Sequence, residues 1–206
     1  EKVKDILINQ RWSRVYLCGV SNRGRDIAPF ILNLLPEALR TGHHSFVKLH
    51  TKKSPHLKGG IDWSDHLINS LLNNTFLSEL NDELENKPQP GLFAPTGTLL
   101  KSSIALGCNV DHLQILLEKK QWDGAWALRQ PYVAGSMMAG RLSAMESLQQ
   151  LQLTIDDFEP EQGQTDGTLA HALERLISWQ YANQDLTIKT LPSESQSVPQ
   201  FGFGWV

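Results

Sequence analysis

The stretch Asp157-Phe-Glu-Pro-Glu-Gln-Gly-Gln-Thr-Asp-Gly-Thr-Leu-Ala-His-Ala-Leu-Glu-Arg175 joins a run of acids and glycines to an amphipathic segment. Apolar residues at helical spacing begin with Leu169 and predict a helix that runs to about Asn183. Asp166 stands where this helix begins, and its carboxylate is expected to cap the free backbone N–H groups of the first turn.

Ionisable groups lie on both sides of this predicted helix start. Glu159 and Glu161 precede it, and His171, Glu174 and Arg175 follow within about two turns. Residues three or four apart share one helix face, so several of these side chains are expected to line one cleft. We interpret the stretch as a candidate functional site, in which Glu159 and Glu161 are better candidates for chemistry than the capping residue.

Short apolar runs that alternate with helix-like segments predict an α/β fold. We expect a mixed sheet flanked by helices in one domain over residues 1–190, with a C-terminal tail over residues 191–206. The predicted strands cover residues 15–20, 45–50, 91–95, 132–140 and 186–190, and the predicted helices cover residues 2–11, 62–72, 75–84, 109–120, 144–151 and 166–183, with a further helix that begins at Asp26.

A polar turn follows the first predicted strand. Asn22 and Gly24 are turn formers, Asp26 can cap the next helix, and Arg23 and Arg25 are displayed at the turn. In an open α/β sheet such turns form the ligand crevice, and the N–H groups of a helix start favour an anion. A turn with solvated arginines is the alternative interpretation.

A basic segment covers the end of the second predicted strand and the loop that follows it. Several cations on one loop suit a diphosphate, a triphosphate or a phosphorylated sugar, whereas a solvated loop and a metal site built on two histidines are alternatives. The segment contains Lys48, His50, Lys52, Lys53, His56 and Lys58.

The composition fits one soluble globular domain. The chain has 206 residues, 40% of them hydrophobic and 20% charged, and its formal net charge of -3 gives no general electrostatic reason to bind nucleic acid or an anionic membrane. Cys18 and Cys108 match neither a disulfide framework nor a metal site, which favours reduced thiols and the cytoplasm. No apolar run is long enough to span a membrane, and because residue 1 is Glu we expect a piece of a longer protein.

Three segments together resemble a known family. They are Asn22-Arg-Gly-Arg-Asp-Ile-Ala-Pro-Phe30, Lys48-Leu-His-Thr-Lys-Lys-Ser-Pro-His56, and the opening stretch from Phe158 to Arg175. They resemble the rhamnan synthesis protein F family of bacterial polysaccharide assembly, and the resemblance spans residues from about 15 to 190. It implies a role in making rhamnose-containing cell-wall polysaccharide or O-antigen, as a glycosyltransferase that takes L-rhamnose from its thymidine diphosphate ester.

The order of the motifs is also similar to that of the nucleotide-sugar fold called GT-A. This resemblance implies that residues 22–26 lie on the nucleotide side, that residues 132–141 lie on the acceptor side, and that Glu159, Glu161 or Asp166 takes the acidic position. The chain departs from the GT-A pattern in two ways. We expect it to lack the first strand or strands, and it has the basic residues 48–56 where a metal-binding Asp-x-Asp is expected.

A leaving diphosphate needs its growing charge stabilised, and fixed cations can replace a metal for this purpose. We therefore expect no cofactor and no divalent metal, and a carboxylate or a histidine takes the proton of the acceptor hydroxyl. The diphosphate cations are Arg23, Arg25, Lys48, Lys52 and Lys53; the candidate bases are Glu159, Glu161, Asp166 and His171; the further substrate-binding residues are Asn22, Asp26, His50, His56, Glu174 and Arg175.

The expected partners are a nucleotide sugar and a glycan acceptor, not nucleic acid. Further domains of the same polypeptide and a peripheral position at the inner membrane fit this reaction. Two alternatives remain open. The domain is a glycan-binding or phosphosugar-binding module of a larger synthase, or it is a hydrolase that uses two carboxylates.

Overall fold

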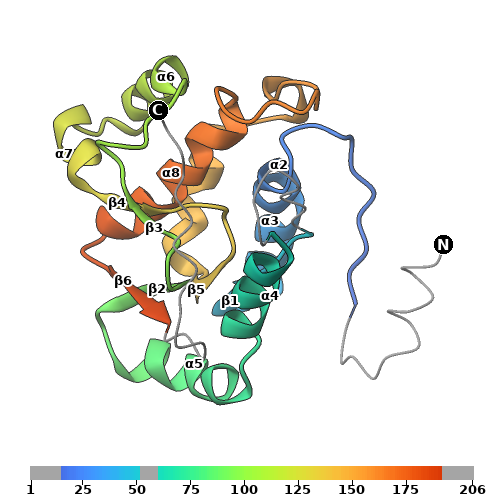
Figure 1. Cartoon of the computed structure of the whole chain (residues 1–206), viewed down its shortest axis with the longest axis vertical. Helices are drawn as coiled ribbons and strands as arrows, with labels where there is room; N and C mark the ends of the chain where they lie inside the picture. Colours follow the sequence, from blue (N-terminus) through green and yellow to red (C-terminus); the bar gives the residue numbers. More distant parts are fainter. Residues whose placement is uncertain (1–14, 52–59, 192–206) are drawn as a thin grey trace.

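A mixed four-stranded sheet lies at the centre of the protein (Figure 1). The computed structural model describes residues 15–51 and 60–191. The strands are ordered β1 (Ser45–Lys48), β5 (Met138–Arg141), β2 (Pro90–Pro95) and β6 (Thr187–Leu191). Since β5 is antiparallel to both β1 and β2, while β2 and β6 are parallel, the carboxyl ends of β1, β2 and β6 meet at one edge. The predicted mixed sheet flanked by helices is confirmed.

Helices cover both faces of the sheet because successive side chains of a strand point to opposite sides. Leu92 and Ala94 belong to a core shared with α8, whereas Phe93 belongs to a second core shared with α4 and α5. The first core contains residues of α2 (Ile27–Pro29), η1 (Phe30–Leu34), α3 (Leu35–Arg40), α6 (Val110–Lys120), α7 (Gly124–Arg129), η2 (Ser143–Leu151) and α8 (Leu169–Ala182), and the second contains residues of α4 (Gly60–Leu71) and α5 (Asn74–Asn86).

Helix α8 crosses the middle of the molecule (Figure 1), and 11 of its 14 residues are buried. Two buried polar contacts fix it to a small antiparallel sheet formed by β3 (Leu99–Lys101) and β4 (Pro131–Val133) and to the turn after β3. The indole Nε1 of Trp179 donates to Ser102 Oγ at 3.0 Å, and Val133 N donates to Ser178 Oγ at 3.0 Å. The predicted helix of the opening stretch is thus the central helix of the fold.

The predicted strand over residues 132–140 is in fact two strands, β4 and β5, joined by a turn. Gly135 and Ser136 both adopt left-handed backbone conformations there, with φ of 84° and 53°. Farther along, a Cβ atom on Gly140 would lie 2.5 Å from the carbonyl oxygen of Gly91, so the two backbones approach closely there. Helix α5 is capped by Asn73, whose side chain accepts from Phe76 N.

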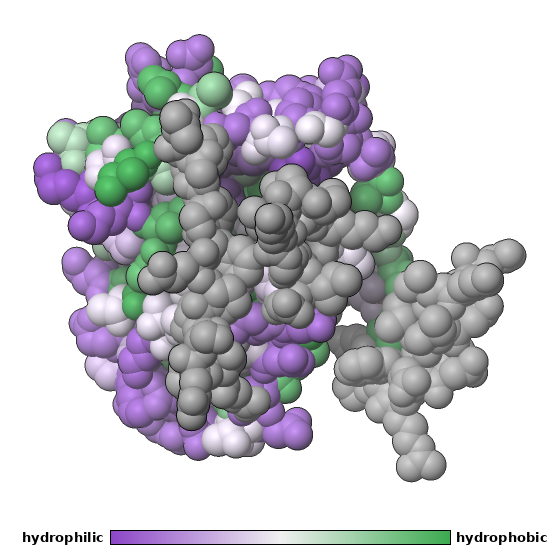
Figure 2. All heavy atoms as spheres, in the orientation of Figure 1, coloured by the Kyte–Doolittle hydropathy of each residue, from purple (hydrophilic) through white to green (hydrophobic). Residues whose placement is uncertain are grey.

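The predicted buried strand over residues 15–20 is wrong. Val15, Tyr16, Leu17 and Val20 are between 41% and 51% exposed, and this stretch pairs with no other described strand. Figure 1 shows it running apart from the sheet beyond α2 and α3, and Figure 2 shows hydrophobic residues exposed along it. A strand pattern predicts pairing only where a neighbouring strand can accept and donate hydrogen bonds.

Some of the predicted elements lie outside the described residues: the helix over residues 2–11, the loop over residues 52–59 and the tail from residue 192. Within residues 15–51 and 60–191, no helix combines the length and the apolar composition that crossing a bilayer requires.

Candidate functional site

Lys48 is the centre of a buried charged cluster at the carboxyl edge of the sheet. Its side chain is 5% exposed, and its Nζ pairs with the carboxylate of Asp26. The same Nζ donates to the carbonyl oxygen of Ser136 at 3.1 Å and to its Oγ at 3.0 Å, while Ser136 Oγ donates to Asp26. Three distant segments meet here, and the charge of Lys48 is neutralised by the protein itself.

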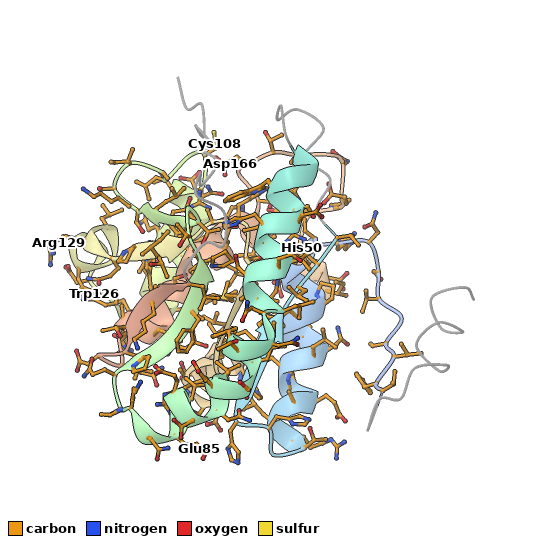
Figure 3. All side chains as sticks on the ribbon, turned by 60° about the horizontal axis from the view of Figure 1, so that its bottom comes forward. His50, Glu85, Cys108, Trp126, Arg129 and Asp166 are labelled. Atoms are coloured by element: carbon orange, nitrogen blue, oxygen red, sulfur yellow. The ribbon has the colours of Figure 1, made fainter. Side chains whose placement is uncertain are left out.

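Asp26 binds this cluster and does not cap the helix that follows it, contrary to the sequence interpretation. Burial alone would raise the pKa of Asp26, but the charges of Lys48 and His50 and the hydrogen bonds from Lys48 and Ser136 leave that pKa below its ordinary value. His50 Nε2 lies 3.9 Å from Asp26 Oδ2 and donates to the carbonyl of Gly135 at 2.8 Å. Figure 3 shows His50 beside α4.

Arg25 joins the first motif to the opening stretch. Its Nε lies 3.3 Å from Glu161 Oε2, its Nη1 lies 2.9 Å from His171 Nε2, and its Nη2 donates to the carbonyl of Gln164 at 2.6 Å. Arg25 itself has φ of 56°, a backbone conformation that is uncommon outside glycine. The turn thus places the Arg25 guanidinium in contact with three acceptors. Two motifs that are remote in sequence therefore form one site.

His171 is neutral in this site. Burial lowers its pKa to about 4, and the neighbouring Arg25 contributes in the same direction. Because a guanidinium can only donate, His171 Nε2 accepts from Arg25, and His171 Nδ1 lies 2.7 Å from Thr168 Oγ1. Thr168 is the N-cap of α8, so the prediction that Asp166 caps this helix is wrong.

The neutral state of His171 predicts a pH-dependent stability. An unfolded chain takes up a proton on this residue below pH 6.5, whereas the folded chain does so only near pH 4. The contribution of His171 is therefore fully present above pH 6.5 and is lost as the pH falls toward 4, by on the order of 2 kcal/mol. Urea unfolding between pH 4.5 and 7 should show a steeper loss for the wild type than for His171→Gln, and equal slopes would contradict the assignment.

Glu159 holds the start of α8. Its two carboxylate oxygens accept from Leu169 N at 3.1 and 3.2 Å, and His112 Nε2 lies 3.0 Å from one of them. The sequence interpretation treated Glu159 as free of any capping duty, and the structure corrects this. A carboxylate bound to two partners on opposite sides is well suited to fix the loop that precedes α8.

Asp166 ties that same loop to the start of α6. It accepts from Cys108 N at 2.7 Å and from Asn109 Nδ2 at 2.6 Å, and Figure 3 shows Cys108 and Asp166 side by side. Burial would raise the pKa of Asp166, but hydrogen bonds from Cys108, Asn109 and Gly167 outweigh it and lower the pKa. Cys108 and Asn109 lie more than fifty residues away from Asp166 in the sequence, and no local sequence signal points to them.

Two further predicted site cations, Arg23 and Arg175, also bind the protein. Arg23 Nη1 donates to the carbonyl of Phe158 at 2.9 Å. Arg175 is 2% exposed, donates to the carbonyl of Ala105 and lies 3.4 Å from Glu174.

Two backbone contacts complete the arrangement. Asn22 contributes its carbonyl, which accepts from Glu161 N at 3.3 Å, and Glu174 accepts from Gly135 N.

Lys52, Lys53 and His56 lie outside the described residues.

The sequence interpretation missed Gly135, Ser136 and Phe158. Gly135 and Ser136 have left-handed backbone conformations, and their carbonyl and hydroxyl groups bind Lys48 and His50. Gly135 was the signal in the sequence that could have pointed to this turn. Within the part of the chain that the structure describes, no group of three or more His, Cys, Asp or Glu side chains is arranged to hold a metal ion.

Comparison with known proteins identifies a family for this chain. Residues 1–186 match the family model for rhamnan synthesis protein F. The uncharacterized protein WxcX from two strains of Xanthomonas campestris pv. campestris is 36% identical over 170 residues, which are 82% of this chain and 24% of each relative. The chain thus spans about a quarter of the length of the curated relatives that it matches, and no solved structure matches it. The resemblance of the three motifs is confirmed, and the chain belongs to the rhamnan synthesis protein F family.

Proposed function

We propose that this chain forms a glycosyl-transfer site in polysaccharide synthesis, with a nucleotide-diphosphate sugar as donor and a glycan as acceptor. The observation that carries the proposal is the convergence of the described parts of the three family motifs at the carboxyl edge of the sheet. Arg25 contacts Glu161 and His171, and the neighbouring Asp26 binds Lys48. Family membership links the chain to polysaccharide synthesis, and ligands of open α/β sheets bind at this edge.

The order and directions of the strands support a GT-A-like arrangement of the proposed site. Antiparallel strand β5 lies between β1 and β2, which run in the same direction, and the turn before β5 reaches the charged cluster. Residues 22–26 and 132–141 therefore flank one site, as the GT-A resemblance implies for its nucleotide and acceptor sides.

Glu161 is the base that we propose for the acceptor hydroxyl. Its Oε1 accepts from Gly163 N at 2.9 Å and its Oε2 faces Arg25, so the carboxylate is oriented at a partly exposed position. His171 is a weaker candidate because both of its ring nitrogens are engaged, Nε2 with Arg25 and Nδ1 with Thr168. We propose that His171 instead positions the guanidinium of Arg25.

We propose that the basic segment after β1 binds the diphosphate of the donor. Arg23, Arg25 and Lys48 are each bound by protein acceptors, so Lys52 and Lys53 carry more of this role than the sequence interpretation gave them. Fixed cations would stabilise the leaving diphosphate without a divalent metal.

The test measures transfer of L-rhamnose from its thymidine diphosphate ester by the full-length protein. We expect Glu161→Gln to lower kcat by about 10²–10⁴-fold while leaving thermal stability unchanged, since it removes a proton acceptor at the surface of the site. Glu79→Gln, on the exposed face of α5, is the matched control and should retain full activity. Activity should also survive a chelator; loss with EDTA and recovery with Mg²⁺ or Mn²⁺ would contradict the metal-free diphosphate site.

A glycan-binding module without chemistry is the second candidate. It is favoured by one observation: Glu159, Asp166 and His171 all bind partners that hold the loop before α8 in place. Unchanged turnover in Glu159→Gln, Glu161→Gln and Asp166→Asn, with each variant folded, would contradict a catalytic role of these acids and favour the glycan-binding module.

A further inference from the structure

The surface beside β3 and the start of α6 exposes apolar side chains. Ile104, in the turn after β3, is 75% exposed, and Val110, the first residue of α6, is 54% exposed. Within residues 15–51 and 60–191 these are the two most exposed large apolar side chains. Figure 2 shows hydrophobic residues at the surface over α6 and the neighbouring β3 region. Exposed apolar side chains that lie near one another mark a binding surface, whereas single ones need no explanation.

A small hydrophobic cluster adjoins this surface. Ala105, Tyr132 and Ala134 are buried together, and Leu100 of β3 is partly buried against them. Satellite clusters of this kind usually lie under a long segment of chain. Among the described strands β3 pairs with β4 alone, and two-stranded sheets are only marginally stable by themselves. The other edge of β3 is therefore suited to a further strand.

The C-terminal tail, residues 192–206, lies outside the described residues, but its sequence has the pattern that such a surface requires. Phe201, Phe203 and Trp205 alternate with Gly202 and Gly204. Successive side chains of an extended segment point to opposite sides, so these three aromatic rings would share one side. The two glycines add no side chain to the other side.

The tail is long enough to reach this surface from the end of β6. Leu191 pairs with Pro95 of β2, and the hydroxyl of Thr96 donates to the carbonyl of Leu191. Ile104 follows Thr96 by eight residues, so it lies no more than roughly 35 Å from Leu191, even if that stretch were fully extended. The twelve residues from Leu191 to Phe203 can span about 40 Å.

We propose that the aromatic side chains of the tail dock on the surface formed by Leu100, Ile104 and Val110, with the tail backbone along the open edge of β3. This surface is too small for a stable interface with a separate protein, which buries about 800 Å² on each side. A tethered segment acts at a high effective concentration, so the same surface is sufficient to hold the tail of its own chain. The proposal goes beyond sugar transfer and does not depend on it.

NMR spectroscopy of the whole chain, labelled with ¹⁵N and at its methyl groups, tests this docking. We expect order parameters above about 0.8 for the N–H groups of Gly202 and Gly204, as in ordered backbone. In Ile104→Asp they should fall below about 0.6, because a carboxylate would replace the apolar contact of the rings. In the wild type, nuclear Overhauser effects should join ring protons of the tail to the methyl groups of Ile104 and Val110.

A tail variant and a matched surface control complete the design. Phe201→Ser/Phe203→Ser/Trp205→Ser leaves residues 15–191 unaltered and should abolish the ring-current shifts of the Ile104 methyl groups. This second variant keeps the test valid if Ile104→Asp does not fold. Ile115→Asp is the control, because Ile115 is 53% exposed on α6 but lies about 140° around the helix axis from its first residue. The tail should stay docked in this control.

Three results would overturn the proposal: order parameters below about 0.6 in the wild type, contacts of the tail with another surface, or an ordered tail in folded Ile104→Asp. Docking on a second copy would make the order parameters depend on protein concentration. A change on dilution by about tenfold would therefore also overturn docking within one chain.

Discussion

Asp26→Ala is expected to lower the free energy of unfolding by about 3–5 kcal/mol, because it leaves the ammonium of Lys48 buried and uncompensated. Lys48 is 5% exposed at its side chain, and Asp26 is its carboxylate partner. The remaining contacts of Lys48, to Ser136, are neutral acceptors and cannot balance its charge. Urea unfolding at pH 7 measures the loss.

The double variant Asp26→Ala/Lys48→Met is the control for this prediction. Removing both charges places a methionine beside Ser136 and near the Phe30 ring, whose centroid lies 5.5 Å from the present position of Nζ. We expect the double variant to be more stable than Asp26→Ala alone. If the two variants were equally destabilised, the loss would come from the backbone around residue 26 and not from the buried charge.

Phe158→Ala is expected to lower the free energy of unfolding by about 3–5 kcal/mol and to abolish most of the proposed transfer activity. The ring is 1% exposed and packs against Gly24, where a Cβ atom would lie 2.4 Å from it. The carbonyl of Phe158 also accepts from Arg23. This one residue therefore holds the loop that carries Glu161 against the turn that carries Arg25, and its loss should disturb both.

Phe158→Leu separates packing from site geometry. Leucine refills part of the cavity, so thermal denaturation should show a much smaller loss of stability than for alanine. A Phe158→Ala protein with wild-type stability would contradict the place of this ring in the core. Wild-type activity in a destabilised Phe158→Ala protein would show that the loop keeps its geometry without the ring.

Much of the fold could be predicted because hydrophobic periodicity is local. The spacing that begins at Leu169 marked α8, and the apolar run before Pro95 marked β2. Pairing is not local. The run from Val15 to Val20 has the same strand pattern but has no partner strand in the described structure, and the turn at Gly135 divides what reads as one strand.

The sequence singled out charged residues for a candidate site but did not reveal the contacts that they make. Charged side chains in three motifs were recognised, and the structure brings Arg25, Glu161 and His171 together. The sequence interpretation took Asp166 as the helix cap and Glu159 as a candidate for chemistry, whereas in the structure Asp166 accepts from Cys108 N and Glu159 accepts from Leu169 N at the start of α8. Local spacing carries no information about such donors.

The contacts of Arg25 and Asp26 have a consequence for synthesis of the chain. Arg25 meets His171 across 146 residues of sequence, and Asp26 meets Ser136 across 110. At the usual pace of translation the first of these separations corresponds to roughly 7–30 s, during which the arginine turn has left the ribosome and its partner has not been made. Contacts of such long range also form slowly. The site is therefore completed only when nearly the whole domain exists, and a prematurely released chain that ends before α8 lacks it.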